Sequence, residues 1–211
     1  MQDNSGRIVF KEFKDYIRGS SGLGLKKKDI SDDGLQAVWA ALDPGGKQVT
    51  ILGTVDGNGD PTTILDGGGA VRVLICQSGE TSTTVFENLV IQNGYAAYGG
   101  GNYGAGMHIK SSSPTLNNCT FRGNSSVNGA GMHNRDGSSP TLTDCTFTSN
   151  SAALDGGGMY NYDTSSPTLT NCTFTDNSAS YGGGMYNDES SVALHSCIVS
   201  LNRAYGLPED S

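Results

Sequence analysis

Two sets of recurring side chains in the second half of the chain are of types that could bind an ion or a partner, and we call each set a file. The first file is acidic. Carboxylates stand four residues after three recurring methionines, at Asp136, Asp163 and Glu189. If the copies stack at the strand spacing of ~4.8 Å, the like charges repel, so a cation or a basic partner would stabilise them. The pattern predicts a candidate metal site, and the alternative is that these are solvated turn residues.

The second file is aromatic and follows the same methionines directly, at His108, His133, Tyr160 and Tyr186. These rings face outward if each Met faces inward. An exposed aromatic strip on a flat sheet is suited to contact with a protein partner or to stacking on a sugar. The alternative is that the residues are simply good strand formers.

Catalytic chemistry is not predicted. Acid–base catalysis needs clustered carboxylates beside a group that transfers the proton. The segment 48–211 has five basic residues, and none of them recurs from turn to turn beside a column of acids: Arg72, Lys110, Arg122, Arg135 and Arg203. We therefore expect no enzyme activity and no cofactor.

Both files arise because one sequence repeat occurs four times between residues 114 and 202. Pro-Thr-Leu at 114–116, 140–142 and 167–169 is followed by Val-Ala-Leu at 192–194, so the period is 25 to 27 residues. Such a period predicts a solenoid, in which each turn must stack on its neighbour to bury its apolar face. The residues that recur in phase are Met107, Met132, Met159 and Met185; Cys119, Cys145, Cys172 and Cys197; Phe121, Phe147, Phe174 and Val199; and Asn124, Asn150, Asn177 and Asn202.

Each turn is predicted to consist of short strands. Sidedness alternates with period two in runs such as residues 169–175, and glycine triplets at 99–101, 156–158 and 182–184 oppose helix. We expect Leu, Cys, Met and Phe to face inward, Thr146 and Tyr160 to be exposed, and the recurring Asn to form an internal ladder. The in-phase cysteines are expected to be buried thiols, with disulfides between adjacent turns as the alternative.

The Gly-Gly-Gly-Met and Asn-Cys-Thr-Phe turns resemble those of right-handed parallel β-helix domains of the pectin-lyase-like type, in particular polymorphic outer-membrane protein repeats. Residues 63–69 and 86–94 look like the first turns of such helices. The resemblance covers about residues 48 to 205 and implies an all-β solenoid of about five to six turns. It does not imply one function, because the fold hosts lyases, hydrolases, adhesins and inert spacers.

Residues 1–47 are predicted to be a separate helical appendage. Residues 3–13 are similar to the second part of an EF-hand calcium loop, but Met1 occupies the first ligand position, so calcium binding is not expected. A helix is predicted over residues 31–42, where Leu35, Val38, Trp39 and Leu42 give a helical stripe. We expect this degenerate EF-hand-like segment to cap the first turn of the domain at 48–211.

Charge and composition indicate which classes of partner are disfavoured. The net charge of −8 lies almost wholly on the solenoid, which argues against nucleic acid and anionic membrane as partners. No apolar run is long enough to span a bilayer. The favoured hypothesis is a non-catalytic structural or interaction module with protein partners, such as an accessory subunit of a larger assembly. The alternative is a carbohydrate-binding or carbohydrate-processing surface protein, and an extracellular, cell-surface or organelle-lumen location is favoured over the cytoplasm.

Overall fold

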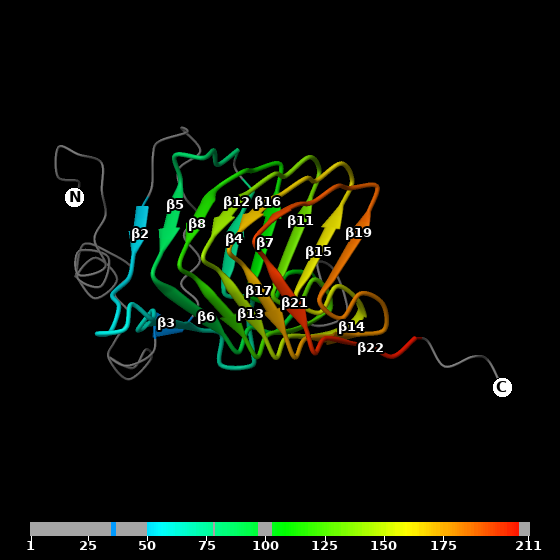
Figure 1. The fold of residues 1–211 in the computed structure, drawn as a ribbon, viewed down its shortest axis with the longest axis horizontal. Helices are drawn as coiled ribbons and strands as arrows, with labels where there is room; N and C mark the ends of the chain where they lie inside the picture. Colours follow the sequence, from blue (N-terminus) through cyan, green and yellow to red (C-terminus); the bar gives the residue numbers. More distant parts are fainter. Residues whose placement is uncertain (1–34, 37–49, 78, 97–102, 207–211) are drawn as a thin grey trace.

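The computed structural model describes residues 35–36, 50–77, 79–96 and 103–206. The chain winds into a parallel β-helix of about five turns, stacked from the cyan turns to the red turn along the long axis of Figure 1. The described strands pair in parallel, and each strand pairs with its copies in the turns before and after it. The predicted solenoid is therefore confirmed, and every repeat is one turn.

Four sheets run along the axis, and we name each by its recurring residue. The Met-sheet consists of β4 (Leu74–Cys76), β7 (Met107–Lys110), β11 (Met132–Arg135), β15 (Met159–Tyr162) and β19 (Met185–Asp188). The Leu-sheet consists of β2 (Thr50–Leu52), β5 (Val85–Glu87), β8 (Thr115–Asn117), β12 (Thr141–Thr143), β16 (Thr168–Thr170) and β20 (Ala193–His195).

The other two sheets complete each turn. The Phe-sheet consists of β1 (Leu35–Gln36), β3 (Thr63–Asp66), β6 (Leu89–Gln92), β9 (Thr120–Arg122), β13 (Thr146–Thr148), β17 (Thr173–Thr175) and β21 (Ile198–Ser200). The Ser-sheet consists of β10 (Ser125–Asn128), β14 (Ser151–Asp155), β18 (Ser178–Ala179) and β22 (Arg203–Ala204). A turn thus passes through the Met-, Leu-, Phe- and Ser-sheets in that order.

The core is a set of columns in which each side chain lies on its own copy. The rings of Phe121, Phe147 and Phe174 stack with centroids 4.7 and 4.5 Å apart and planes within 3° of parallel. The residues predicted to be buried are all fully buried, namely Met132, Met159, Cys145, Cys172, Phe147 and Phe174. The five cysteines are free thiols, as the favoured interpretation predicted. Thr146 is partly rather than fully exposed.

An asparagine ladder crosses the core, as predicted. The side-chain Nδ2 of Asn124 donates to Oδ1 of Asn150 at 2.9 Å, and Asn150 repeats this bond to Asn177, and Asn177 to Asn202. The backbone N–H of each of these donors bonds the same oxygen. A buried amide is tolerated because its polar atoms are satisfied in this way.

Corners between sheets need the left-handed backbone, and this explains the polar residues that recur there. Asn118, Asp144, Asn171 and Ser196 turn the chain from the Leu-sheet into the Phe-sheet with φ between 48 and 55°. Asn and Asp adopt this conformation more readily than other non-glycine residues. Their recurrence follows from the turn rather than from a chemical role.

The predicted helix over residues 31–42 is wrong where the structure describes it. Leu35 and Gln36 form β1, which pairs in parallel with Leu65 and Asp66 of β3. The first strand of a sheet leaves backbone groups unpaired, and an added strand satisfies them. The rest of the predicted EF-hand-like appendage lies outside the described residues. In the described part of the chain, no helix is long and apolar enough to cross a membrane.

Candidate functional site

The four predicted aromatic residues form a column on the outer surface of the Met-sheet. His108, His133, Tyr160 and Tyr186 pair in register. Their ring centroids are 5.2, 5.0 and 5.6 Å apart in sequence, and the ring of Tyr103 stacks on His133 at 4.8 Å. The predicted strip therefore exists as a continuous column of neighbouring rings, stacked between the two histidines and tilted toward the tyrosines.

The prediction that these rings are exposed is wrong for three of the four. His108 is 7% exposed, His133 is 2% and Tyr160 is 7%, while Tyr186 is half-buried. Each ring is covered by its copies in the neighbouring turns. The backbone of a glycine segment also lies against the Cβ end of each of these side chains. A Cβ added at Gly129 would lie 2.9 Å from Cβ of His133, and φ at Gly129 is 58°. Only glycine allows the backbone to pass so close.

The two histidines are held neutral. Burial, with a further contribution from Arg72 and Arg135, lowers the pKa of His108 to about 3. Burial, then His108 and Arg135, holds the pKa of His133 well below its usual range. Nδ1 of both rings is buried and bonds no described residue. The rings are stacked only 21° from parallel, so their in-plane lone pairs do not converge on one ion.

The later part of the column opens into a tyrosine–aspartate cluster, formed by Asp155, Tyr160, Tyr162, Tyr186 and Asp188. The hydroxyl of Tyr160 donates to Oδ2 of Asp188 at 3.3 Å, and the exposed ring of Tyr162 stacks on Tyr160 at 6.0 Å. Burial and then the charge of Asp188 raise the pKa of Asp155. The cluster thus combines the exposed ring of Tyr162 with two carboxylates, those of Asp155 and Asp188. Repeat counting missed Asp155, because no other copy carries an acid there.

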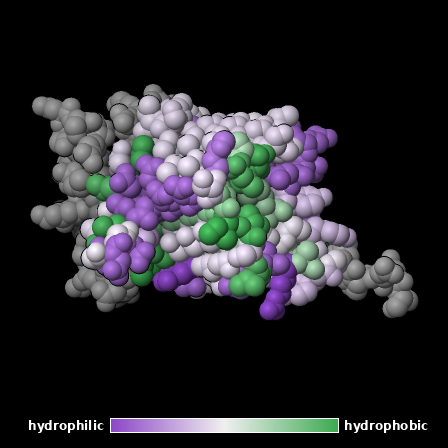
Figure 2. Space-filling model, viewed as in Figure 1, coloured by the Kyte–Doolittle hydropathy of each residue, from purple (hydrophilic) through white to green (hydrophobic). Residues whose placement is uncertain are grey.

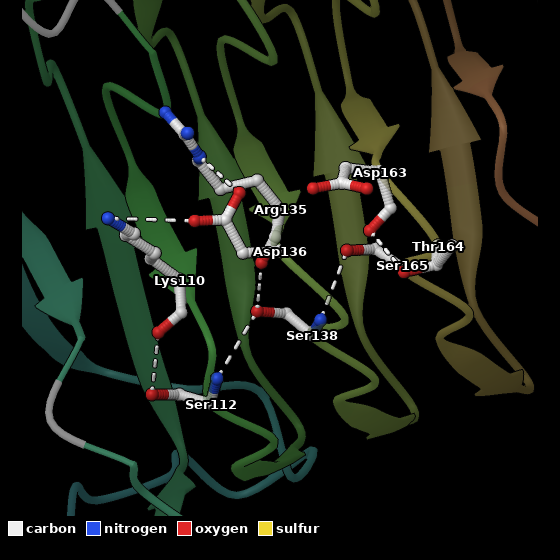
Figure 3. Close-up of polar contacts among 8 residues, drawn as sticks. All are labelled: Lys110, Ser112, Arg135, Asp136, Ser138, Asp163, Thr164 and Ser165. Carbon is white, nitrogen blue, oxygen red and sulfur yellow. Dashed lines mark hydrogen bonds and ion pairs between the residues drawn. The ribbon is translucent and has the colours of Figure 1, made fainter.

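The predicted acidic file occupies the corner between the Met- and Leu-sheets (Figure 3). Asp136, Asp163 and Glu189 have φ of 56, 52 and 49°, and Ser111 has 49° at the same corner of the preceding turn. Arg135 Nε donates to Asp136 Oδ1 at 2.9 Å, and Lys110 Nζ lies 3.5 Å from Oδ2. The hydrogen bond from Arg135 is the main cause of the lowered pKa of Asp136.

These contacts favour the turn-residue interpretation of the file. Its first carboxylate is already neutralised by two cations, and the shared backbone conformation accounts for the residue types. Within the residues that the structure describes, no three His, Cys, Asp or Glu side chains are grouped so that they could hold a metal ion.

A serine ladder lies beside this corner and was not predicted. The backbone N–H of Ser112 donates to Oγ of Ser138 at 3.3 Å, Ser138 to Ser165 at 3.1 Å, and Ser165 to Ser190 at 3.1 Å. Ser112 Oγ also donates to Oε2 of Glu80 at 2.7 Å. The recurring Ser-Ser before each Pro-Thr-Leu was the signal that could have revealed it.

The last turn differs from all others, and we call residues 185–205 the terminal rung. Of ten exposed large hydrophobic residues in the described chain, five lie here. Leu194 and Val199 pair in register with the fully buried Leu169 and Phe174, so both face the core. They are 47% and 53% exposed because no described residue stacks on them.

The outer surface of the terminal rung is also apolar. Ile198 stands in register with the outward Thr173, and Leu201 takes the corner position that Ser149 and Asp176 hold in earlier turns. Ile198 is 59% and Leu201 73% exposed, and Leu201 has a φ of 57°. A left-handed leucine costs ~1–2 kcal/mol. Figure 2 shows hydrophobic surface where Figure 1 places β21.

The family model described as right handed beta helix region matches residues 62–208, well over half of the chain. No curated protein matches the chain. No solved structure matches it either.

Proposed function

The chain belongs to the right handed beta helix family, and we propose that it is a rigid, non-catalytic interaction module that binds a protein partner through its terminal rung. The observation that supports this is the change of the outward residues there from polar to apolar, with Ile198 where Thr173 stands one turn earlier. The family itself hosts many functions, so the proposal rests on this surface.

The apolar surface has the composition of an interface centre. The exposed side chains of Leu194, Ile198, Val199, Leu201 and Tyr205 lie within 12 residues of sequence. Exposed apolar residues that gather in this way often mark an interaction site. Arg203 and Glu189 are exposed in the same rung and supply a charged rim.

Rigidity is the other requirement of such a module. The asparagine and serine ladders satisfy buried polar atoms in successive turns, and the Phe column fills the centre. A solenoid built from nearest-neighbour contacts holds a surface at a fixed distance along its axis. In β12, β13, β16 and β17 both outward strand positions are Thr, which offers no acid–base group.

The test is a double variant that restores the repeat. Ile198→Thr with Leu201→Asp places the residues of the preceding turn on the terminal rung and removes the strain at Leu201. We expect the fold and melting temperature to be kept, and recovery of the protein partner from the native source to fall at least tenfold. Chemical cross-links to that partner should map to residues 185–205.

The control is Arg122→Thr, which gives another outward position the residue of its copies Thr148 and Thr175. This variant should recover the partner at the wild-type level. Equal recovery by the double variant and the wild type would overturn the proposed docking surface.

Carbohydrate recognition is the second candidate, and the tyrosine–aspartate cluster favours it. Tyr162 is 40% exposed and offers a ring face, and the carboxylates of Asp155 and Asp188 can accept hydrogen bonds from sugar hydroxyls. Glycan-array binding that is lost on Tyr162→Ala would support it. Tyr181→Ala is the matched control, because Tyr181 is 44% exposed but stacks on no other ring of the described residues. Absence of binding to any glycan would exclude this candidate.

A further inference from the structure

The sequence pattern that accepts an Asn-linked sugar, Asn-x-Ser/Thr, occurs three times in the β-helix. The three copies begin at Asn118, Asn124 and Asn171. All three satisfy the pattern equally well, so only their surroundings in the folded protein can distinguish them.

Attachment of a sugar makes two demands on a folded asparagine. The sugar is bulky and must lie in solvent, so the side chain must be exposed. A free amide Nδ2 carries two hydrogens, and one of them is replaced when Nδ2 bonds the sugar. A folded acceptor must therefore need no more than one of its amide hydrogens for bonds within the protein.

Asn124 fails both demands. It is 1% exposed, because it is the first member of the asparagine ladder. Its Nδ2 donates to the carbonyl oxygen of Ile91 at 3.1 Å and to Oδ1 of Asn150 at 2.9 Å, so both hydrogens are used. A sugar on Asn124 is incompatible with the fold.

Asn118 is partly buried and fails the second demand. Its Nδ2 donates to Oδ1 of Asn88 at 2.8 Å and to the carbonyl oxygen of Gly59 at 2.9 Å. Gly59 belongs to the loop between β2 and β3, which reaches this corner from two turns earlier. A sugar on Asn118 would break one of these bonds and displace the loop.

Asn171 meets both demands. It is exposed at the corner between β16 and β17, with a φ of 54°. Within the described part of the chain its Nδ2 makes one hydrogen bond, to Oδ1 of Asp144 at 3.2 Å. Asp144 and Ser196 hold the same corner in the turns before and after it. Since a described turn lies on each side of Asn171, its exposure does not depend on where the described residues end.

The other two residues of this pattern are oriented by strand alternation. Cys172 is fully buried in the core. Thr173 pairs in register with Thr146 and Ile198 and lies on the outer surface of the Phe-sheet. Asn171 and the hydroxyl-bearing residue that the pattern requires are therefore both on the outside, and a buried residue separates them.

We infer that Asn171 carries an Asn-linked glycan. In the reaction, Nδ2 of Asn171 forms a bond to C1 of the sugar and one amide proton is lost. The bond between C1 and the diphosphate oxygen of an activated sugar donor breaks, and the diphosphate leaves with its electron pair. The remaining N–H still donates to Asp144. This modification is independent of docking through the terminal rung.

Mass spectrometry of the protein purified from its native source tests the inference. Peptides are fragmented by electron transfer, which leaves sugars attached. We expect a sugar on Asn171, at an occupancy at least tenfold higher than on Asn118 or Asn124. An oligosaccharide indicates a lipid-linked donor, and a single sugar indicates a nucleotide-linked donor. No sugar on Asn171, or equal occupancy of the three asparagines, would overturn the inference.

Variants produced in the same source test the chemistry of the acceptor. Thr173→Ala removes the hydroxyl that the pattern requires and should abolish the sugar, whereas Thr173→Ser keeps the hydroxyl and should keep the sugar. Asn118→Gln is the control and should leave the sugar mass unchanged. A sugar that persists on Asn171 in Thr173→Ala, or that is lost in Asn118→Gln, would contradict the assignment. Melting temperatures near that of the wild type show that each variant is folded.

Discussion

Replacing Asn150 by alanine tests whether the asparagine ladder holds the turns together. Asn150 is fully buried. Its Nδ2 donates to Phe121 O at 3.0 Å and to Asn177 Oδ1 at 2.9 Å. Its Oδ1 accepts from N and Nδ2 of Asn124 at 3.1 and 2.9 Å. Truncation removes one hydrogen bond from each of four buried groups, namely Phe121 O, Asn177 Oδ1 and the two nitrogens of Asn124.

Each group left unsatisfied costs ~1–3 kcal/mol, so we expect the free energy of unfolding to fall by ~3–6 kcal/mol. That is a large part of the 5–15 kcal/mol typical of a domain. The matched control is Asn202→Ala in the same ladder, where the residue is only partly buried and water can replace the lost bonds. We expect this control to cost ~1 kcal/mol.

Urea unfolding followed by circular dichroism measures both variants. A loss below 1 kcal/mol for Asn150→Ala, or equal losses for the two variants, would refute the conclusion that the ladder stabilises the fold through satisfied buried amides.

Three further outcomes are expected. Because the folded pKa of His108, about 3, lies below the unfolded value of 6.5, the stability that neutral His108 contributes is present above pH 6.5 and is lost as pH falls toward 3. The loss is at most about 1.4 kcal/mol per pH unit, and His108→Tyr should reduce this slope in acid titrations of unfolding; an unchanged slope contradicts the assignment. Thiol labelling by iodoacetamide should modify the partly exposed Cys197 first and leave Cys145 unreactive in the native state, since burial raises the pKa of the Cys145 thiol; equal rates would contradict this. Gly129→Ala should destabilise the fold by more than 1 kcal/mol because of its contact with His133, whereas Gly59→Ala, with open space around it, should cost less; the reverse order would contradict the close approach.

The columns could be predicted from sequence because each turn repeats its neighbour. In-phase recurrence of Met132, Cys145, Phe147 and Asn150 indicated both the buried face and the ladder, and the structure confirms these positions. Stacking is a nearest-neighbour interaction, so like residues at a fixed period determine the contact without further information.

The same reasoning failed where burial depends on more than strand alternation. Tyr160 alternates with inward residues and was expected outside, yet its stacked copies and the backbone at Gly156 cover it. The helical spacing of Leu35 predicted a helix, but Leu35 forms β1, which pairs in parallel with the edge of β3. Contacts between a residue and a neighbouring backbone segment are not marked by any periodic pattern of residue types in the sequence.

The terminal rung was missed for a different reason. Comparing repeats highlights positions that agree, whereas Ile198 and Leu201 are informative because they depart from Thr173 and Asp176. Their exposure becomes visible only when the last turn is seen to lack a described neighbour on one side. Residues that depart from a repeat are therefore as informative as the residues that keep it.

Hydrogen exchange measured on the free protein and on its complex with the native partner tests the central claim most directly. We expect amides of residues 185–205 to exchange at least tenfold more slowly in the complex. Amides of the interior turns around β11 and β13 should be unchanged. Protection confined to the outer surface of the Met-sheet, with the terminal rung unaffected, would contradict the assignment of the docking surface.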